Sequence, residues 1–195
     1  HFLKDGDPKP RRSGKLTRFL ELLREVRDSE GASLVFTQYR EMGELLQRVV
    51  REELEFPVSF FHGGLARTAR EKMVAEFQDP SGPPVMVVSL KAGGTGLNLT
   101  RANHVFHYDR WWNPAVEDQA TDRAFRIGQT RDVTVHRMVS QGTLEEQIHG
   151  VLEEKRQLAD RVIGTGETWL SELDDDTLHD LVRLGSDAVL EEEEA

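Results

Sequence analysis

The chain has 195 residues, of which 37% are apolar and 31% are charged, a composition typical of globular proteins. It contains no cysteine, which excludes disulfide scaffolds, thiolate metal sites and cysteine nucleophiles. No apolar run approaches the roughly 18 residues that a membrane span requires, and no signal peptide is visible, so we expect no membrane partner.

The formal net charge of −10 is concentrated in the C-terminal part of the chain. Residues 141–195 hold 16 acidic and 4 basic side chains, whereas residues 1–140 hold 19 acidic and 21 basic ones. The larger part is therefore close to neutral, and the overall acidity does not exclude a nucleic-acid partner.

Residues 1–14 are rich in proline, glycine and basic side chains and are predicted to be a linker. Because the chain starts at His1 without a methionine, we expect it to be a fragment of a longer protein. Apolar residues at helical spacing then alternate with short apolar runs. Helices are predicted over residues 16–26, 41–53, 66–77 and 114–126, and strands over residues 33–37, 58–61, 85–89, 104–108 and 133–138. This alternation predicts an α/β fold with a parallel sheet sandwiched by helices, and a ligand site beyond the carboxyl ends of the strands.

After Gly142 the pattern becomes helical throughout. A long charged helix is predicted over residues 143–162, a turn at 164–167 and a last amphipathic helix over 177–184. We therefore divide the chain into a linker, an α/β domain, a helical extension and an acidic tail, over residues 1–14, 15–140, 141–190 and 191–195.

A glycine-rich loop, LKAGGTGLNLT, occupies residues 90–100, directly after the most strand-like segment. Its three glycines would let backbone amides converge on an anion, and Thr95 adds a hydroxyl donor. The loop is not a P-loop, because no G-x-x-x-x-G-K-[ST] occurs in the chain, and it is not a dinucleotide fingerprint, because Leu99 stands in place of the last glycine. A tight turn whose glycines serve only its geometry is an equally good interpretation.

The predicted helix at 114–126 carries a polar stripe. Gln119, Arg123 and Arg126 fall at i, i+4 and i+7 and are predicted to lie on one face. Two arginines one turn apart can bind successive phosphate oxygens and neutralise the charge that develops in phosphoryl transfer. The plainer alternative is a solvated surface helix with an Asp122–Arg126 pair.

A tryptophan pair follows the fourth predicted strand, next to an arginine (Arg110, Trp111 and Trp112). These side chains could stack on bases or on another domain, but packing in the core or at an interface is the favoured interpretation. His104 and His107 are predicted to point to opposite faces of one strand, so we expect no metal site there.

Three segments together resemble motifs V and VI of the SWI/SNF family of helicase-like ATPases, in superfamily 2. They are GGTGLNLT at 93–100, DRWWNP at 109–114 and QATDRAFRIGQ at 119–129. The resemblance covers about residues 15–163, and the segment beyond it is loosely similar to the tails of prokaryotic members.

Further segments fit the same family. VFTQY at 35–39 is similar to motif IV, and GTLEEQI at 142–148 also agrees with the pattern. FHGG at 61–64 stands where the family more often has Asp-Gly, so His62 and Gly64 depart from the pattern and receive no role.

The resemblance implies two RecA-like lobes that face each other across an ATP cleft. The first lobe of such proteins supplies a phosphate-binding lysine and an Asp-Glu pair for magnesium, and this chain has neither a Walker A sequence nor an Asp-Glu dipeptide. We therefore expect the chain to be the second RecA-like lobe, with ATP and magnesium bound mainly by the first.

The resemblance also implies site residues. Arg123 and Arg126 would be the catalytic arginines that reach the ATP γ-phosphate. Residues for nucleotide binding or for coupling it to DNA would be Gln119, Asp122, Gly94, Thr95 and Gly96. From the residues themselves, because the nearly neutral body needs a local patch to hold DNA, we expect DNA contacts from Lys91, Thr95, Arg101, Arg110, Trp111 and Trp112.

The leading hypothesis is half of an enzyme, namely the C-terminal lobe of a DNA-dependent ATPase that translocates on duplex DNA and remodels protein–DNA complexes. Its partners would be the first lobe and DNA. It would be located in the cytoplasm of a prokaryote or in the nucleus of a eukaryote. A stand-alone module that binds nucleic acid or protein is the alternative, but it predicts disrupted motifs, and both arginines are present. An unrelated hydrolase would need its own nucleophile, and no Gly-x-Ser-x-Gly element occurs.

Overall fold

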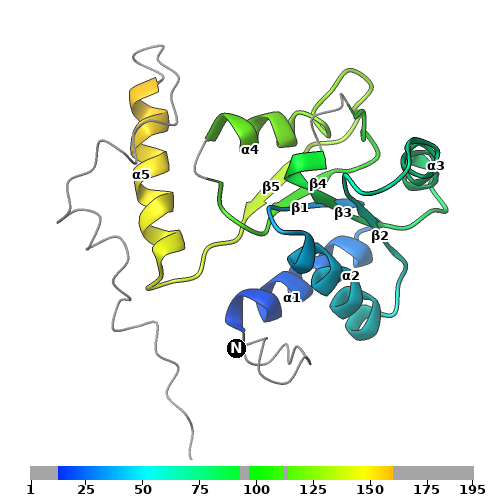
Figure 1. Ribbon diagram of the computed structural model, residues 1–195, viewed down its shortest axis with the longest axis horizontal. Helices are drawn as coiled ribbons and strands as arrows, with labels where there is room; N and C mark the ends of the chain where they lie inside the picture. Colours follow the sequence, from blue (N-terminus) through cyan, green and yellow to red (C-terminus); the bar gives the residue numbers. More distant parts are fainter. Residues whose placement is uncertain (1–12, 93–96, 112–113, 160–195) are drawn as a thin grey trace, which may run out of the picture. The chain divides into compact units, whose positions relative to one another are not determined.

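A five-stranded parallel sheet lies at the centre of the fold (Figure 1). The computed structural model describes residues 13–92, 97–111 and 114–159. The strands are β1 (Ser33–Thr37), β2 (Val58–Phe61), β3 (Val85–Ser89), β4 (His104–His107) and β5 (Thr134–Arg137). They correspond to the five predicted strands and pair in the order β2-β3-β1-β4-β5, which confirms the predicted parallel sheet.

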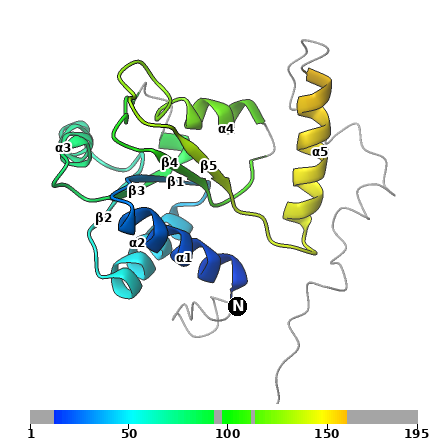
Figure 2. The same cartoon turned by 180° about the vertical axis from the view of Figure 1, so that it is seen from behind.

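Helices cover both faces of this sheet (Figures 1 and 2). Helices α1 (Gly14–Asp28) and α2 (Arg40–Leu54) pack on one face, and α3 (Arg67–Gln78) and α4 (Pro114–Thr121) pack on the other. Neighbouring strand residues alternate between two separate cores, because successive side chains of a strand point to opposite faces. In β4, for example, Phe106 packs in the core under α1 and α2, and Val105 packs in the opposite core.

Helix α1 begins inside the segment that was predicted to be linker. Ser13 is its N-cap, and the Ser13 hydroxyl accepts a hydrogen bond from the Leu16 N–H at 3.2 Å. The capping serine was the available sequence signal for this earlier start. The rest of the predicted linker, residues 1–12, lies outside the described residues.

The chain divides into two compact units. One comprises His1–Asp109 and Val116–Met138, and the other comprises Arg110–Ala115 and Val139–Ala195. The second unit contains helix α5 (Leu144–Ala159), whose start is capped by Glu146: its carboxylate accepts a hydrogen bond from the Gly142 N–H at 2.8 Å. The predicted turn at 164–167, helix at 177–184 and tail at 191–195 lie outside the described residues.

None of the helices in the described ranges is long and apolar enough to cross a membrane. This observation is limited to residues 13–92, 97–111 and 114–159.

Gly43 allows α2 to pack closely against β2. It is a buried residue in the middle of the helix, and a Cβ atom at this position would overlap the ring of Phe60, which is itself buried. The absence of a side chain at position 43 therefore sets how near α2 can lie to the sheet.

We expect Gly43→Ala to destabilise the chain, although alanine is the better helix former. The propensity gain of about 1 kcal/mol is outweighed by an overpacking cost of about 1–3 kcal/mol. Gly150→Ala in α5 is the matched control, because a Cβ there meets nothing within 4 Å, and it should be stabilising. Urea unfolding midpoints of the two variants measure the difference, and equal shifts would show that the Phe60 ring yields without cost.

Candidate functional site

The strand order places a topological switch point at the carboxyl ends of β1 and β4. The connection that leaves β1 leads toward β2 on one side of the sheet, and the connection that leaves β4 leads toward β5 on the other. Asp109 bridges the two strand ends: its carboxylate accepts hydrogen bonds from the Thr37 hydroxyl at 2.5 Å and from the Gln38 N–H at 3.0 Å. Parallel α/β sheets bind ligands at such a switch point.

The glycine loop begins at the carboxyl end of the adjacent strand β3. A short 3₁₀ helix, η2 (Leu90–Ala92), follows β3 directly. Gly94, Thr95 and Gly96 lie outside the described residues, as does the side chain of Lys91. The roles that the sequence assigns to these four residues therefore stay predictions.

Residues 97–103, which we call the return segment, lead from the glycine loop back to the start of β4. Their backbone forms no regular secondary structure, yet it is hydrogen-bonded both to α3 and to the arginine region. On one side the Gln78 side chain of α3 accepts a hydrogen bond from the Arg101 N–H at 3.0 Å. On the other side the Leu99 N–H donates to the carbonyl oxygen of Arg123 at 2.9 Å. The return segment thus connects the end of α3 to the region that carries the arginines.

The prediction that one helix carries Gln119, Arg123 and Arg126 on a continuous face is wrong. Helix α4 ends at Thr121, and residues 122–129, which we call the arginine turn, form a series of tight turns. The backbone N–H groups of Arg123 and Ala124 bond three residues back instead of four. The helix gives way because tertiary contacts of the turn compete with continued helical bonding.

Two contacts hold the end of α4. The Thr121 hydroxyl donates to the Glu117 carbonyl at 3.0 Å, so its only proton is used there. His107 Nε2, also 3.0 Å from that hydroxyl, must therefore be the donor in its own hydrogen bond. His104, by contrast, lies beside His136 with a ring nitrogen distance of 3.1 Å, so the two histidines of β4 face opposite sides, as predicted.

Arg123 is the buried member of the arginine pair. Only 8% of its surface is exposed, and its Nε has no hydrogen-bond partner among the described residues. Burial first, and the nearby charge of Arg126 second, lower the pKa of the Arg123 guanidinium from its usual value. A guanidinium nevertheless stays charged in proteins. Two cations held this close, one of them buried, are complementary to an anion such as a phosphate.

Several other residues in and next to the arginine turn are exposed, whereas Ala124 is buried. Arg126 is exposed, and so are the apolar side chains of Phe125 and Ile127, the latter completely. Gln119 and Asp122 are exposed as well. The turn therefore presents apolar and basic groups to the outside, around the buried Arg123.

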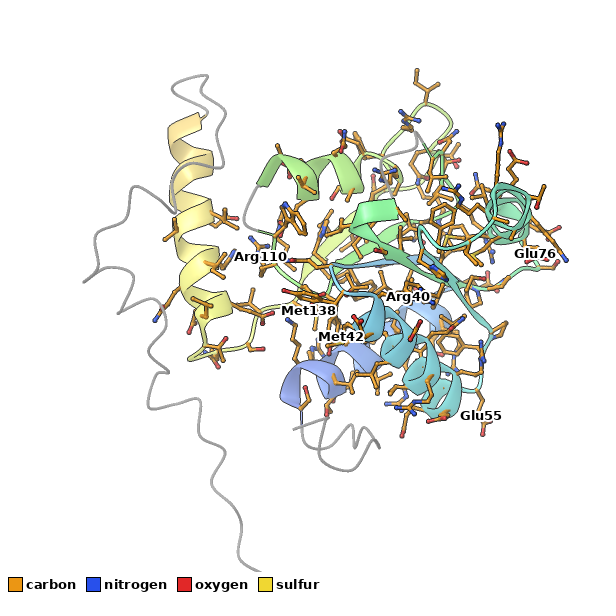
Figure 3. The ribbon with its side chains drawn as sticks, in the orientation of Figure 1. Arg40, Met42, Glu55, Glu76, Arg110 and Met138 are labelled. Carbon is orange, nitrogen blue, oxygen red and sulfur yellow. The ribbon has the colours of Figure 1, made fainter. Side chains whose placement is uncertain are left out.

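The structure does not place all predicted DNA contacts at the surface. The guanidinium of Arg101 donates to four backbone carbonyl oxygens at the end of α3 and in the α3–β3 connection, those of Phe77, Pro80, Gly82 and Pro83, at 2.6–3.2 Å. Arg110, labelled in Figure 3, has only 4% of its surface exposed. Arg101 thus holds a loop together and Arg110 is buried, so we leave both out of the proposed contacts. Trp111 is half-buried, and Trp112 lies outside the described residues.

Sequence reasoning missed a cavity of about 590 Å³ beside α3. One face of α3 forms its wall, and the end of β2 and the return segment complete it. The lining residues are Phe61, Arg67, Arg70, Glu71, Val74, Ala75 and Leu97. The helical spacing of Arg67, Arg70 and Glu71 was a signal for a common face, but only the fold brings this face to Leu97.

Arg67 and Arg70 give this cavity a positive rim. Arg67 is 87% exposed at its side chain, and its Nε lies 2.8 Å from Glu71 Oε1. The Nε of Arg70 is buried without a hydrogen-bond partner in the described part of the chain. Arg70 and Arg123 thus share one feature, a buried guanidinium nitrogen without a hydrogen-bond partner among the described residues.

We expect Arg123→Met to stabilise the chain. The buried guanidinium is desolvated without full compensation, and a side chain of similar length without charge removes that cost, a gain of about 0.5–2 kcal/mol. Arg126→Met is the matched control, since changes at exposed positions stay within about 0.5 kcal/mol. Urea unfolding measures both variants. A loss of stability in Arg123→Met would mean that the native chain already compensates this charge.

Comparisons with known proteins bear on the fold and the family of the chain. Residues 14–128 match the family described as helicase conserved C-terminal domain. The Bacillus subtilis protein YwqA, described as a proposed ATP-dependent helicase/translocase, is 49% identical over 177 residues, which cover 91% of this chain and 19% of the relative. The chain therefore spans about a fifth of the length of that relative.

Solved structures from Sulfolobus solfataricus are similar as well. The SWI2/SNF2 ATPase core in complex with dsDNA is 42% identical, with a TM-score of 0.78, and the match covers 94% of this chain and 38% of that one. The C-terminal domain of the SWI2/SNF2 ATPase is 39% identical, with a TM-score of 0.74, and the match covers 94% and 75% of the two chains. These likenesses confirm the predicted RecA-like fold.

Proposed function

Since this chain belongs to the helicase conserved C-terminal domain family, we propose that it is the second lobe of a two-lobe SWI2/SNF2-type ATPase that moves along duplex DNA and remodels protein–DNA complexes. The extent of the matches supports this assignment. The chain is covered almost completely by the Sulfolobus ATPase core, yet it accounts for only 38% of that core. The proposed partners are a first lobe of the same protein and DNA.

The single observation that carries the proposal is the buried Arg123 beside Arg126. In phosphoryl transfer, charge accumulates on the oxygens of the transferred group, and arginines placed there stabilise the transition state. Arg123 has a donor without a partner among the described residues, and Arg126 lies at the surface. We infer that both reach the γ-phosphate of an ATP held by the facing lobe, with Gln119 and Asp122 beside them.

The exposed apolar side chains of the arginine turn support an interface at this place. Phe125 is 68% exposed and Ile127 fully exposed, and both flank Arg126. Apolar side chains of this size are costly in water and gain most when another surface covers them. A facing lobe would cover them as it brings ATP to the arginines.

Among the described residues there is no group of three or more histidine, aspartate and glutamate side chains that could hold a metal ion. We propose that the facing lobe supplies the magnesium ligands, together with most of the ATP-binding groups.

For DNA we propose contacts along the glycine loop and the adjacent cavity. Lys91, Thr95 and the amides of Gly94 and Gly96 would bind backbone phosphates, because convergent amides and a lysine suit anions. Arg70 and the exposed Arg67 extend the positive surface on the other side of Leu97. These few groups, rather than the net charge, would hold the DNA.

In the two-lobe protein, Arg123→Ala and Arg126→Ala should each lower kcat by roughly 10³-fold, with ATP binding much less affected. Lysine should rescue either position poorly, because it lacks the planar fork of a guanidinium. Steady-state ATPase assays and nucleotide titrations measure the two effects separately.

Arg131→Ala provides the matched control for these variants, because Arg131 is an exposed arginine just beyond the arginine turn. It should keep kcat, and the 195-residue chain alone should hydrolyse no ATP. Near-normal turnover in Arg126→Lys would favour a plain surface role for the arginines. Turnover by the chain alone would contradict the assignment as one of two required lobes.

The chain alone should bind duplex DNA weakly and with a shallow salt dependence, corresponding to about two to four phosphates. Affinity should hardly depend on the DNA sequence, since phosphate contacts carry no base code. Lys91→Ala and Thr95→Ala should both weaken binding. Fluorescence anisotropy of labelled duplexes at several salt concentrations gives the affinity and the slope.

The charge-matched control is Arg24→Ala, because Arg24 is exposed on α1, which packs on the opposite face of the sheet from α3. Equal losses in Arg24→Ala and Lys91→Ala would indicate general electrostatic attraction instead of a site. Tight, sequence-selective binding would reveal a DNA-reading surface other than the one proposed.

A further inference from the structure

Gln129 ends the arginine turn and bonds to two parts of the chain at once. Its Nε2 donates to the carbonyl oxygens of Thr100 at 3.0 Å and Ala102 at 2.8 Å, both in the return segment. The same Nε2 lies 3.2 Å from the carbonyl oxygen of Ala124, inside the arginine turn. One side-chain amide therefore joins the return segment to the arginine turn.

The geometry uses the full bonding capacity of the amide. Two N–H groups serve three carbonyl oxygens, so one of them is shared, and Oε1 accepts the Arg131 N–H at 2.9 Å. A side chain with donors only, or acceptors only, cannot form this set. The assignment of nitrogen and oxygen follows from the partners, since three carbonyls require a donor and one N–H requires an acceptor.

Backbone bonds complete the connection. The Leu99 N–H donates to the Arg123 carbonyl at 2.9 Å, and the Gln129 N–H donates to the Arg126 carbonyl at 2.9 Å. The backbone of Arg123 is therefore bonded to the return segment, and the backbone of Arg126 is bonded to Gln129. Gly128 closes the turn with a φ of +104°, a conformation that glycine adopts without strain.

We propose that Gln129 is a positioning residue, which fixes Arg123 and Arg126 relative to the return segment. The proposal rests on the proposed function for its effect on turnover. Its structural part, that the Gln129 amide holds the arginine turn against the return segment, stands independently. Gln129 touches neither the nucleotide nor the DNA in this scheme, and acts only through the turn.

Gln78 offers a matched comparison on the other side of the same segment. Its Oε1 accepts the Arg101 N–H at 3.0 Å, and its Nε2 donates to the Asn98 carbonyl at 3.3 Å. It is also a half-buried glutamine that binds the return segment, but it holds that segment to α3 and has no bond to the arginine turn. Loss of Gln78 should loosen the return segment while it leaves the turn in place.

The first experiment measures hydrogen exchange of single amides in the chain, in Gln129→Met and in Gln78→Met. Methionine keeps the length and volume of glutamine and removes its hydrogen bonds. We expect Gln129→Met to speed exchange at Leu99 and Gln129 by about tenfold, with Val87 in β3 unchanged. Gln78→Met should speed exchange at Arg101 and leave Gln129 unchanged. Unchanged exchange at Leu99 in Gln129→Met overturns the structural part.

The second experiment measures ATP turnover of the same variants in the two-lobe protein. A misplacement of catalytic groups by about 1 Å can cost 10²-fold, so Gln129→Met should lower kcat by about 10- to 100-fold. The KM for ATP should stay within about twofold, because the facing lobe binds the nucleotide. Gln78→Met should keep kcat. If Gln129→Met does not fold, Gln129→Asn takes its place, since it keeps an amide but is one methylene too short to reach all the same partners.

The outcomes separate this proposal from the proposed function. Faster exchange at Leu99 with unchanged kcat overturns the positioning role, provided that Arg123→Ala abolishes turnover. An equal fall of kcat in Gln78→Met and Gln129→Met also overturns it, because loosening of the return segment alone would then explain the effect. If Arg123→Ala keeps turnover, the proposed function fails, and the exchange data still decide whether Gln129 holds the turn.

Discussion

The position of β1 between β3 and β4 is the constraint on which the site depends. All five strands are parallel, so after each strand the chain must return to the end of the sheet where the strands begin. The connection from β3 to β4 must also cross over β1, which lies between them. Parallel crossovers are usually helical. Among its described residues, 90–92 and 97–103, this connection consists of η2 and the irregular return segment. Backbone without regular structure on a covered face needs hydrogen-bond partners from elsewhere.

Two side chains far from this segment in the sequence, Gln78 and Gln129, form hydrogen bonds with it. Arg101, within the segment, donates to backbone carbonyl oxygens at the end of α3 and in the α3–β3 connection. As a result, three loops that follow different helices or strands form one bonded unit. This unit links the glycine loop, the wall of the cavity beside α3, and the arginine turn. The proposed roles of these residues thus depend on how the β3–β4 connection is held in place, and not on one sequence motif alone.

The sequence predicted the sheet well because its signals are local. Each strand is a short apolar run, and each of the helices α1 to α3 repeats its apolar residues with helical spacing, so the predicted bounds differ from the observed ones by a few residues at most. Helix α4 was predicted too long for the opposite reason. Local spacing continues to Arg126, but the bonds that end the helix at Thr121 come from His107 and from the return segment.

The candidate site was predictable only in part for the same reason. The arginine pair and the glycine loop follow from their own sequence pattern. The sequence pattern does not show which hydrogen-bond partners surround an arginine in the fold, and these partners decide whether its guanidinium keeps a donor for a ligand. Arg101 and Arg123 look alike in the sequence, yet the first is saturated by four carbonyl oxygens and the second keeps a donor without a partner among the described residues. The cavity beside α3 likewise required Leu97 to meet a helix that ends well before it in the chain.

The glutamine bonds of the return segment have a consequence for how the lobe responds to its medium. Neither amide carries a charge or titrates in water, and counterions do not screen a bond between an amide and a carbonyl oxygen. The hydrogen bonds between the return segment and the arginine turn therefore depend neither on ionic strength nor on proton concentration. Ion pairs at the same places would weaken as the salt concentration rises. If the lobe binds nucleic acid as proposed, added salt would weaken that binding and leave these hydrogen bonds intact.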